Sequence, residues 1–288
     1  MLGKLMKYEF KATSRLLVPM YLAVIVFSFV NRLFLSIPEQ NIQNDIISGL
    51  LNVIRVTFIL GLVLLIFASF FVTFIIMIRR FYTNLLCDEG YLMHTLPVKP
   101  YQHIFSKLFV SVVWNLVNFL VIILSLFILL ATPVRLDNMY NDLHYLFAMM
   151  QSEFSSIGVI FSTADIVLYV VEILLLLIVS SMSGNLLMYA SMSFGHLFNR
   201  RRVLYSVAGY LGLSFIVQFI TSIGTYLITA ICFVVNDSGG DIMIGFLEDH
   251  TLLFFHGTLW VGIISGILFA LIYYFITHFV MKKRLNLQ

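Results

Sequence analysis

Six long apolar stretches separated by short polar segments are the dominant pattern of this chain. Each stretch is long enough to cross a bilayer as a helix, since about 20 apolar residues cover roughly 30 Å of hydrocarbon. None shows the alternation of apolar and polar positions that is typical of membrane barrel strands. The pattern therefore predicts an all-α polytopic membrane protein, with transmembrane helices at Leu16–Ile37, Val53–Ile78, Leu108–Ala131, Asp165–Ala190, Val203–Val235 and Phe255–Val280.

Composition supports the same prediction. Hydrophobic residues make up 61% of the 288 residues and charged residues 11%, whereas soluble domains have about 45–50% and about 25%. A soluble core of this size cannot hide so much apolar surface, so we expect the bilayer to be its solvent. The whole chain, 1–288, is then a single transmembrane domain.

The basic residues give an orientation, because insertion tends to leave lysine and arginine on the cytoplasmic side. Fourteen of the 17 basic residues lie before the first span, after the second, after the fourth or in the tail 281–288: Lys4, Lys7, Lys11, Arg15, Arg79, Arg80, Lys99, Lys107, Arg200, Arg201, Arg202, Lys282, Lys283 and Arg284. Both termini are therefore predicted to be cytoplasmic. The net charge of +3 then describes an inner membrane face and not a surface for nucleic acid.

Residues 1–15 are predicted to form an amphipathic helix at the membrane surface. On a helical wheel, Lys4, Lys7, Lys11 and Arg15 share one arc, and Leu2, Leu5, Met6 and Phe10 share the opposite side. Such a helix lies in the headgroup layer with its cations toward anionic lipid. It acts either as an orientation anchor or as a lever that also touches a cytoplasmic partner. Glu9 favours the lever, because a lipid anchor gains nothing from a carboxylate in the apolar arc.

The loop 79–107 between the second and third spans carries the most specific signal. Asp88 or Glu89 can cap a short helix, and Pro97 and Pro100 end it two turns later. This short helix would carry exposed apolar side chains at Tyr91, Leu92, Met93 and Leu96. Exposed apolar residues on a cytoplasmic projection indicate a docking site for another protein.

This loop resembles that of type-2 ATP-binding-cassette (ABC) transporter permeases, in the Gram-positive bacterial form. The resemblance lies in Glu89-Gly90-Tyr91, in Leu96-Pro97-Val98 and in the basic Lys107, and the opening KYEFK at Lys7–Lys11 is similar as well. In that family the segment forms a coupling helix that seats on the ATPase subunit, and the amphipathic start is a connecting helix. Tyr91 departs from the commoner threonine, which bears on which ATPase the chain accepts.

The resemblance implies a permease subunit of the bacterial plasma membrane that exports an amphipathic substrate such as an antimicrobial peptide, lipid or drug. Its partners would be an ABC-type ATP-binding subunit, which carries Mg-ATP, and a second copy or a related permease subunit. The docking residues would be Asp88, Glu89, Gly90, Tyr91, Leu92, Met93, Leu96, Pro97 and Glu9. The family also has a re-entrant helical pair before its last span. Residues 238–256 form either such a pair, from Ile242–Leu247 and Thr251–Phe255, or a plain surface loop.

Several polar residues fall inside the predicted spans. Glu172 is a carboxylate two turns into the fourth span, and it either pairs with Arg32 or Arg55 or forms a substrate or proton site. Asn115, Asn118 and Gln218 either join helices by hydrogen bonds or line a polar cavity. Small residues at Gly262, Gly266 and Ala270 share one stripe and predict a close helix contact, within the fold or at a dimer face.

The sequence contains none of the motifs that we associate with catalysis in such a chain. No GxxxxGK[ST] phosphate loop and no HExxH or Cys/His metal spacing occurs, so we expect neither ATP hydrolysis nor a metal cofactor in this subunit. Two alternatives to the permease remain open. One is a non-catalytic membrane sensor or scaffold that uses the same loop, and the other is a secondary transporter driven through Glu172.

Overall fold

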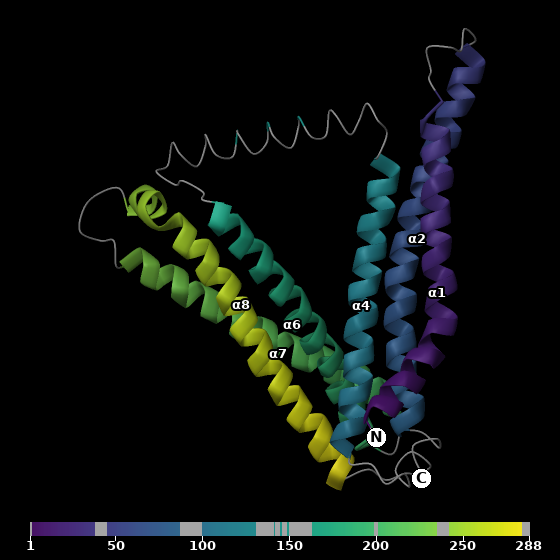
Figure 1. Ribbon diagram of the computed structural model, residues 1–288. Coiled ribbons are helices and arrows are strands. Elements are labelled where there is room, and N and C mark those ends of the chain that lie inside the picture. Colours follow the sequence, from purple (N-terminus) through teal and green to yellow (C-terminus); the bar gives the residue numbers. More distant parts are fainter. Residues whose placement is uncertain are drawn as a thin grey trace. The chain divides into compact units, whose positions relative to one another are not determined.

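The computed structural model describes residues 2–37, 45–86, 100–130, 163–198, 201–234 and 242–283, together with residues 141, 145 and 149. The continuous ranges form six helices, which are labelled in Figure 1. They are α1 (Leu2–Leu35), α2 (Asp45–Leu86), α4 (Pro100–Leu130), α6 (Thr163–Gly195), α7 (Arg202–Val234) and α8 (Ile242–Lys283). No strand occurs among the described residues.

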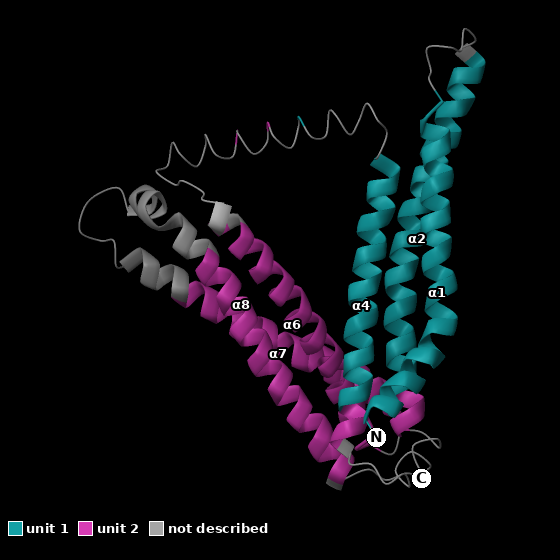
Figure 2. Cartoon of the chain, in the orientation of Figure 1, with its two compact units in different colours: residues 1–81, 105–142 teal, residues 82–104, 143–288 magenta. Residues whose placement is uncertain are grey.

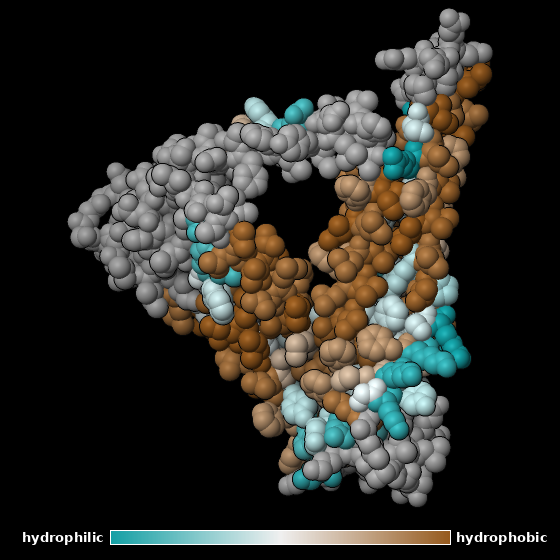
Figure 3. Space-filling model, viewed as in Figure 1, coloured by the Kyte–Doolittle hydropathy of each residue, from teal (hydrophilic) through white to brown (hydrophobic). Residues whose placement is uncertain are grey.

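All six helices are long and apolar enough to cross a membrane, which fits a multi-pass membrane protein and agrees with the sequence prediction. Helices suit this setting because every backbone hydrogen bond within them is satisfied without water. Hydrophobic residues cover most of the helix surface that Figure 3 shows, as expected of helices that face lipid.

The predicted boundaries differ from the structure in three places. The amphipathic start and the first span form one continuous helix, α1. No glycine or proline stands at the junction of the two segments, and Pro19, a few residues later, lies inside the helix without ending it. Helix α2 continues through Arg80 to Leu86, so the predicted loop 79–107 is helical at both ends. Helix α8 is continuous from Ile242, so residues 242–256 do not form the plain surface loop that was one of the two alternatives, and the re-entrant pair stays a prediction.

The chain divides into two compact units, coloured separately in Figure 2, and each is described by itself. Unit 1 contains residues 1–81 and 105–142, that is, α1, most of α2 and most of α4. Its core is formed by Leu17, Tyr21, Met77, Val110 and Trp114. Hydroxyl and amide side chains join these helices: Tyr21 bonds Thr73 at 2.9 Å, Ser28 bonds Ser125 at 2.6 Å, and Ser69 donates to Asn118 at 3.1 Å.

Unit 2 contains residues 82–104 and 143–288, and in it α6 packs against both α7 and α8. Two glycines of α8 allow the closest approach to α6. A Cβ atom on Gly262 would lie 3.0 Å from Leu176, and one on Gly266 would lie 2.6 Å from Val179. Residue numbers rise together along both helices, so α6 and α8 run parallel. The small-residue stripe therefore packs within the fold, as one of its two interpretations predicted.

A tight corner joins α6 to α7. The helix ends at Gly195, where a Cβ atom would lie 2.7 Å from the backbone nitrogen of Ser206 and 2.8 Å from the carbonyl oxygen of Arg202. Backbone bonds from Leu197 to Phe194 and from Phe198 to Gly195 close the turn. Arg201 then takes a left-handed conformation with φ of 55°, which is uncommon for a residue other than glycine.

The corner gives a test of the packing in unit 2. We expect Gly195→Ala to destabilise the protein by about 1–3 kcal/mol, because the new methyl group meets backbone atoms that cannot turn aside. The melting temperature in detergent measures the effect. Gly184→Ala on the same helix is the matched control, since a Cβ atom there meets nothing within 4 Å. An unchanged melting temperature for Gly195→Ala would contradict the packing described.

Candidate functional site

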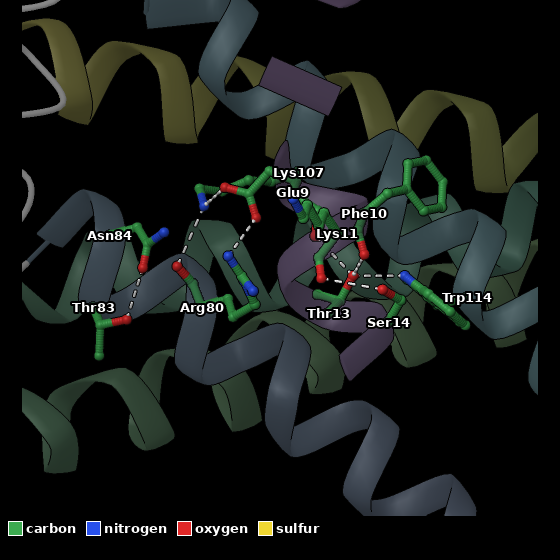
Figure 4. Close-up of polar contacts among 10 residues, drawn as sticks. All are labelled: Glu9, Phe10, Lys11, Thr13, Ser14, Arg80, Thr83, Asn84, Lys107 and Trp114. Atoms are coloured by element: carbon green, nitrogen blue, oxygen red, sulfur yellow. Dashed lines mark hydrogen bonds and ion pairs between the residues drawn. The ribbon is translucent and has the colours of Figure 1, made fainter. Parts of the chain in front are cut away.

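The first half of α1 carries a buried carboxylate that is held by two cations. Glu9 is 6% exposed. Lys107 Nζ of α4 lies 2.6 Å from Glu9 Oε1, and an Arg80 guanidinium nitrogen of α2 lies 3.1 Å from Glu9 Oε2 (Figure 4). The Lys107 ammonium also reaches the carbonyl oxygen of Arg80 at 3.4 Å. These charges therefore bring α1, α2 and α4 together at one place in unit 1.

The helical spacing of α1 explains why Glu9 is inside. Its buried residues recur every three or four positions and so form one face of the helix: Glu9, Thr13, Leu17, Tyr21, Val24, Ser28 and Asn31. Glu9 is the first of these positions. A carboxylate there has to find partners within the protein, because burying an unpaired charge costs several kcal/mol.

The same face continues the polar contacts from Glu9 toward the apolar part of α1. The Thr13 hydroxyl donates to the Glu9 carbonyl oxygen at 2.8 Å and accepts from the Trp114 indole N–H at 2.8 Å. The Trp114 ring packs on Phe10 and Tyr21, with ring centroids 6.1 and 5.9 Å apart. Charge, hydrogen bonds and aromatic packing thus fix the rotation of α1 about its axis.

This arrangement corrects the expectation for Glu9 as a docking residue. Its side chain is inside unit 1 and has partners from two other helices, so it is not on a surface that another protein could touch. The cationic arc of the helical wheel is confirmed, because Lys4, Lys7, Lys11 and Arg15 are all exposed. The lever interpretation thus loses Glu9 as its support and stays a prediction, because Glu9 contacts the chain's own helices.

The other predicted docking residues lie outside the described residues. These are Asp88, Glu89, Gly90, Tyr91, Leu92, Met93, Leu96 and Pro97. What the structure does describe are the two helix ends from which the segment 87–99 leaves and returns, at Leu86 of α2 and Pro100 of α4. Arg80 and Lys107, the two partners of Glu9, each lie within two turns of one of these ends.

The predicted arginines in the spans differ in their surroundings. Arg55 of α2 closes the end of α1, since it donates to the Phe34 carbonyl oxygen at 3.2 Å and to the carbonyl oxygen of Ile37. It also donates to the Asn52 side chain at 3.2 Å. The last carbonyls of a helix lack intrahelical partners, so Arg55 satisfies groups that would otherwise need water. Arg32 is half-buried in the last turn of α1.

Among the predicted span amides, Asn118 bonds to another helix. It is 3% exposed on α4 and accepts from Ser69 of α2, which supports helix joining at this position. Asn115 is half-buried on the same helix. Gln218 is exposed on α7, and its side chain has no hydrogen bond within the described part of the chain.

Glu172 forms a second buried charge cluster, in unit 2. It is 2% exposed. His256 Nδ1 lies 2.7 Å from one carboxylate oxygen, and the Trp260 indole N–H donates to the other at 2.8 Å. The His256 ring stacks on Tyr169 at 4.1 Å. The partners of Glu172 are thus a histidine and a tryptophan of the same unit. The sequence analysis suggested Arg32 or Arg55 of unit 1 as a partner, and that pairing stays a prediction.

His196, directly after α6, lies against Tyr82 of the last turns of α2, with ring centroids 5.2 Å apart. Burial and the nearby positive charge of Arg202 lower the pKa of His196 below its usual value of 6.5. The imidazole is therefore neutral near pH 7, and its Nε2 is buried with no hydrogen-bond partner in the part of the chain that the structure describes. This contact links the corner between α6 and α7 to the helix end that precedes segment 87–99.

Sequence analysis did not identify His256 and Trp260 as partners of Glu172, nor Arg80 and Lys107 as partners of Glu9. A charged residue on an apolar helix face was a signal that each carboxylate needed a partner. The identity of the partner depends on which helices are neighbours and on their register, which one helical wheel does not give.

Comparison of the chain with protein-family models, with curated protein sequences and with solved structures finds no match. In the part of the chain that the structure describes, no three His, Cys, Asp or Glu side chains come together as metal ligands. The interpretation of the site therefore rests on its geometry and charge.

The Glu9 cluster makes a direct prediction about stability. We expect Glu9→Gln to destabilise the protein by about 3–5 kcal/mol, because it leaves two cations without their counter-charge. Lys11→Gln is the matched control on the same helix, since Lys11 is exposed and its loss should change stability by less than about 0.5 kcal/mol. Thermal unfolding in detergent measures both variants. Equal melting temperatures for the two would show that the cluster does not hold the helices.

Proposed function

We propose that this chain is the membrane-spanning permease subunit of an ATP-driven ABC transporter, which exports an amphipathic substrate. The observation that supports this most is the Glu9 cluster. It ties the start of α1 to both helices that flank segment 87–99, through Arg80 on one side and Lys107 on the other. Segment 87–99 is where the sequence resembles a coupling helix.

A permease that an ATPase subunit drives needs rigid contacts between its helices next to the segment on which the ATPase docks. A push on segment 87–99 acts on the ends of α2 and α4 directly. Because Glu9 is buried and bonded to both helices, the start of α1 has to move with them or lose its counter-charges. The three helices of unit 1 would therefore respond together, as rigid-body switching of a helix bundle requires.

Hydrogen bonds between α1 and its neighbouring helices continue from Glu9 into the apolar part of α1. Thr13 bonds Trp114, Tyr21 bonds Thr73, and Ser28 bonds Ser125, so polar contacts follow α1 from its start to its last turns. Hydrogen bonds of this kind join helices in any membrane bundle. In a permease they would also carry a displacement from one end of unit 1 toward the other.

A second connection supports the same proposal in unit 2. Tyr82 at the end of α2 packs on His196 in the corner between α6 and α7. The backbone there is tight, with Gly195 against Ser206 and a left-handed Arg201. A displacement of segment 87–99 would thus reach the helices of unit 2 through the last turns of α2.

The assembly would contain two such permeases, identical or related, and two separate ATPase subunits that bind Mg-ATP. In this proposal both termini and segment 87–99 lie on the cytoplasmic side of the bacterial plasma membrane, where ATP is present; the distribution of basic residues supports this orientation. This chain itself would be a transport subunit and not an enzyme. Its exposed cations on α1 would face anionic headgroups while the coupling segment meets the ATPase.

The test is recovery of an ATPase with the tagged chain from the source membranes. We expect a phosphate-loop protein with ATPase activity to co-purify with the native chain. Replacing Tyr91, Leu92 and Leu96 by alanine should reduce the recovered activity at least about tenfold, because it removes the apolar contact of the dock. Ile46, Ile47 and Leu50 to alanine is the matched control, since these apolar residues are exposed at the opposite end of α2.

Three results would contradict the proposal: no ATPase in the native sample, equal recovery with the Tyr91, Leu92 and Leu96 variant, or loss with the control. A co-purifying protein without ATPase activity would favour the scaffold. Uptake that depends on an ion gradient, is insensitive to ATP and is lost in Glu172→Gln would favour a secondary transporter.

A further inference from the structure

The cluster around Glu172 has features that helix packing does not require. Its carboxylate lies in the first turns of α6, and His256 and Trp260 come from α8. Further along the same two helices, Gly262 and Gly266 already give close contact with Leu176 and Val179. The helix pair is therefore joined without Glu172, and a carboxylate within an apolar span is costly.

The hydrogen bonds define which atoms remain available. An ionised carboxylate only accepts, so both of its partners donate: the indole N–H of Trp260 to one oxygen and Nδ1–H of His256 to the other. In a neutral imidazole this leaves Nε2 as an acceptor on the far side of the ring. Neither partner of Glu172 among the described residues is a lysine or an arginine, so no permanently charged cation of these residues pairs with the carboxylate.

The exposure of the cluster is uneven. Glu172 is 2% exposed, whereas the His256 side chain is 21% exposed and Trp260 is 46% exposed. The Tyr169 ring lies parallel to the imidazole, 4.1 Å from it. The indole and the imidazole are thus the accessible part of the cluster, and the carboxylate is its buried part.

We propose that this cluster binds the ammonium head of an amphipathic amine. The N–H groups of a primary ammonium can donate to His256 Nε2, and its charge is attracted to the Glu172 carboxylate and to the face of the Trp260 indole. The apolar tail would lie along the exposed apolar side chains one turn further on, such as Ile173, four residues after Tyr169, and Ile264, four residues after Trp260. The site requires no ATP or partner, so it stands apart from the proposed permease function.

The experiment measures binding to the purified chain in detergent, with no ATPase present. The probe is radiolabelled dodecylamine, and the competitors are unlabelled dodecylamine and dodecanol, which has the same tail and no charge. We expect the amine to displace the probe at concentrations at least about tenfold lower than the alcohol. Glu172→Gln keeps the shape of the side chain and removes its charge, so it should weaken amine binding about tenfold or more.

Two further variants make the result specific. Trp260→Phe replaces the indole by a phenyl ring, whose cation–π attraction is weaker, and it should weaken amine binding several-fold. This variant also tests the proposed site if Glu172→Gln is too unstable in detergent for amine binding to be measured. His278→Gln is the control, because His278 is on the same helix and stacks on Tyr274, and it should bind as the native chain does.

Equal displacement by amine and alcohol would overturn the proposal, as would native affinity in both Glu172→Gln and Trp260→Phe. The first result would mean that only the tail is bound, and the second that the charge is not recognised. Because no nucleotide enters the experiment, such a failure leaves the permease proposal untouched. Failure to recover an ATPase would likewise leave the amine site standing.

Discussion

The structure of unit 1 depends on one constraint: a carboxylate that the helix pattern of α1 places inside must be neutralised by cations from its neighbours. Glu9 meets this constraint through Lys107 and Arg80. Because each cation is on a different helix, one side chain fixes the mutual position of three helices. The two cations lie within two turns of Leu86 and Pro100, the helix ends that flank residues 87–99, so the cluster joins α1 to the helices on both sides of that segment.

The other helix contacts in each unit reflect the absence of a hydrophobic driving force between helices in lipid. Apolar side chains face lipid as readily as each other, so helices associate through close packing and hydrogen bonds. Unit 1 uses hydroxyl and amide contacts, of which Ser28 to Ser125 at 2.6 Å is the shortest between span residues. Unit 2 uses small residues, with Gly266 so close to Val179 that no side chain would fit between them.

The sequence predicted those features that depend on one helix at a time. The six apolar runs, the exposed cations of α1 and the close contact at Gly262 and Gly266 follow from period and composition alone. The partners of Glu9 and Glu172 depend on register between helices, and no single run contains that information. The continuity of α1 was missed because a change from amphipathic to apolar composition was interpreted as a break, although the backbone has none there.

The most direct test of the account is a double-mutant cycle on Glu9 and Lys107, measured as the free energy of unfolding in mixed micelles. The cycle compares Glu9→Gln, Lys107→Met and the double variant. If the buried pair holds the helices as described, the double variant should be less unstable than the sum of the single losses, with a coupling of at least about 1 kcal/mol. Additivity within about 0.5 kcal/mol would mean that the two side chains act independently, and it would contradict the central claim.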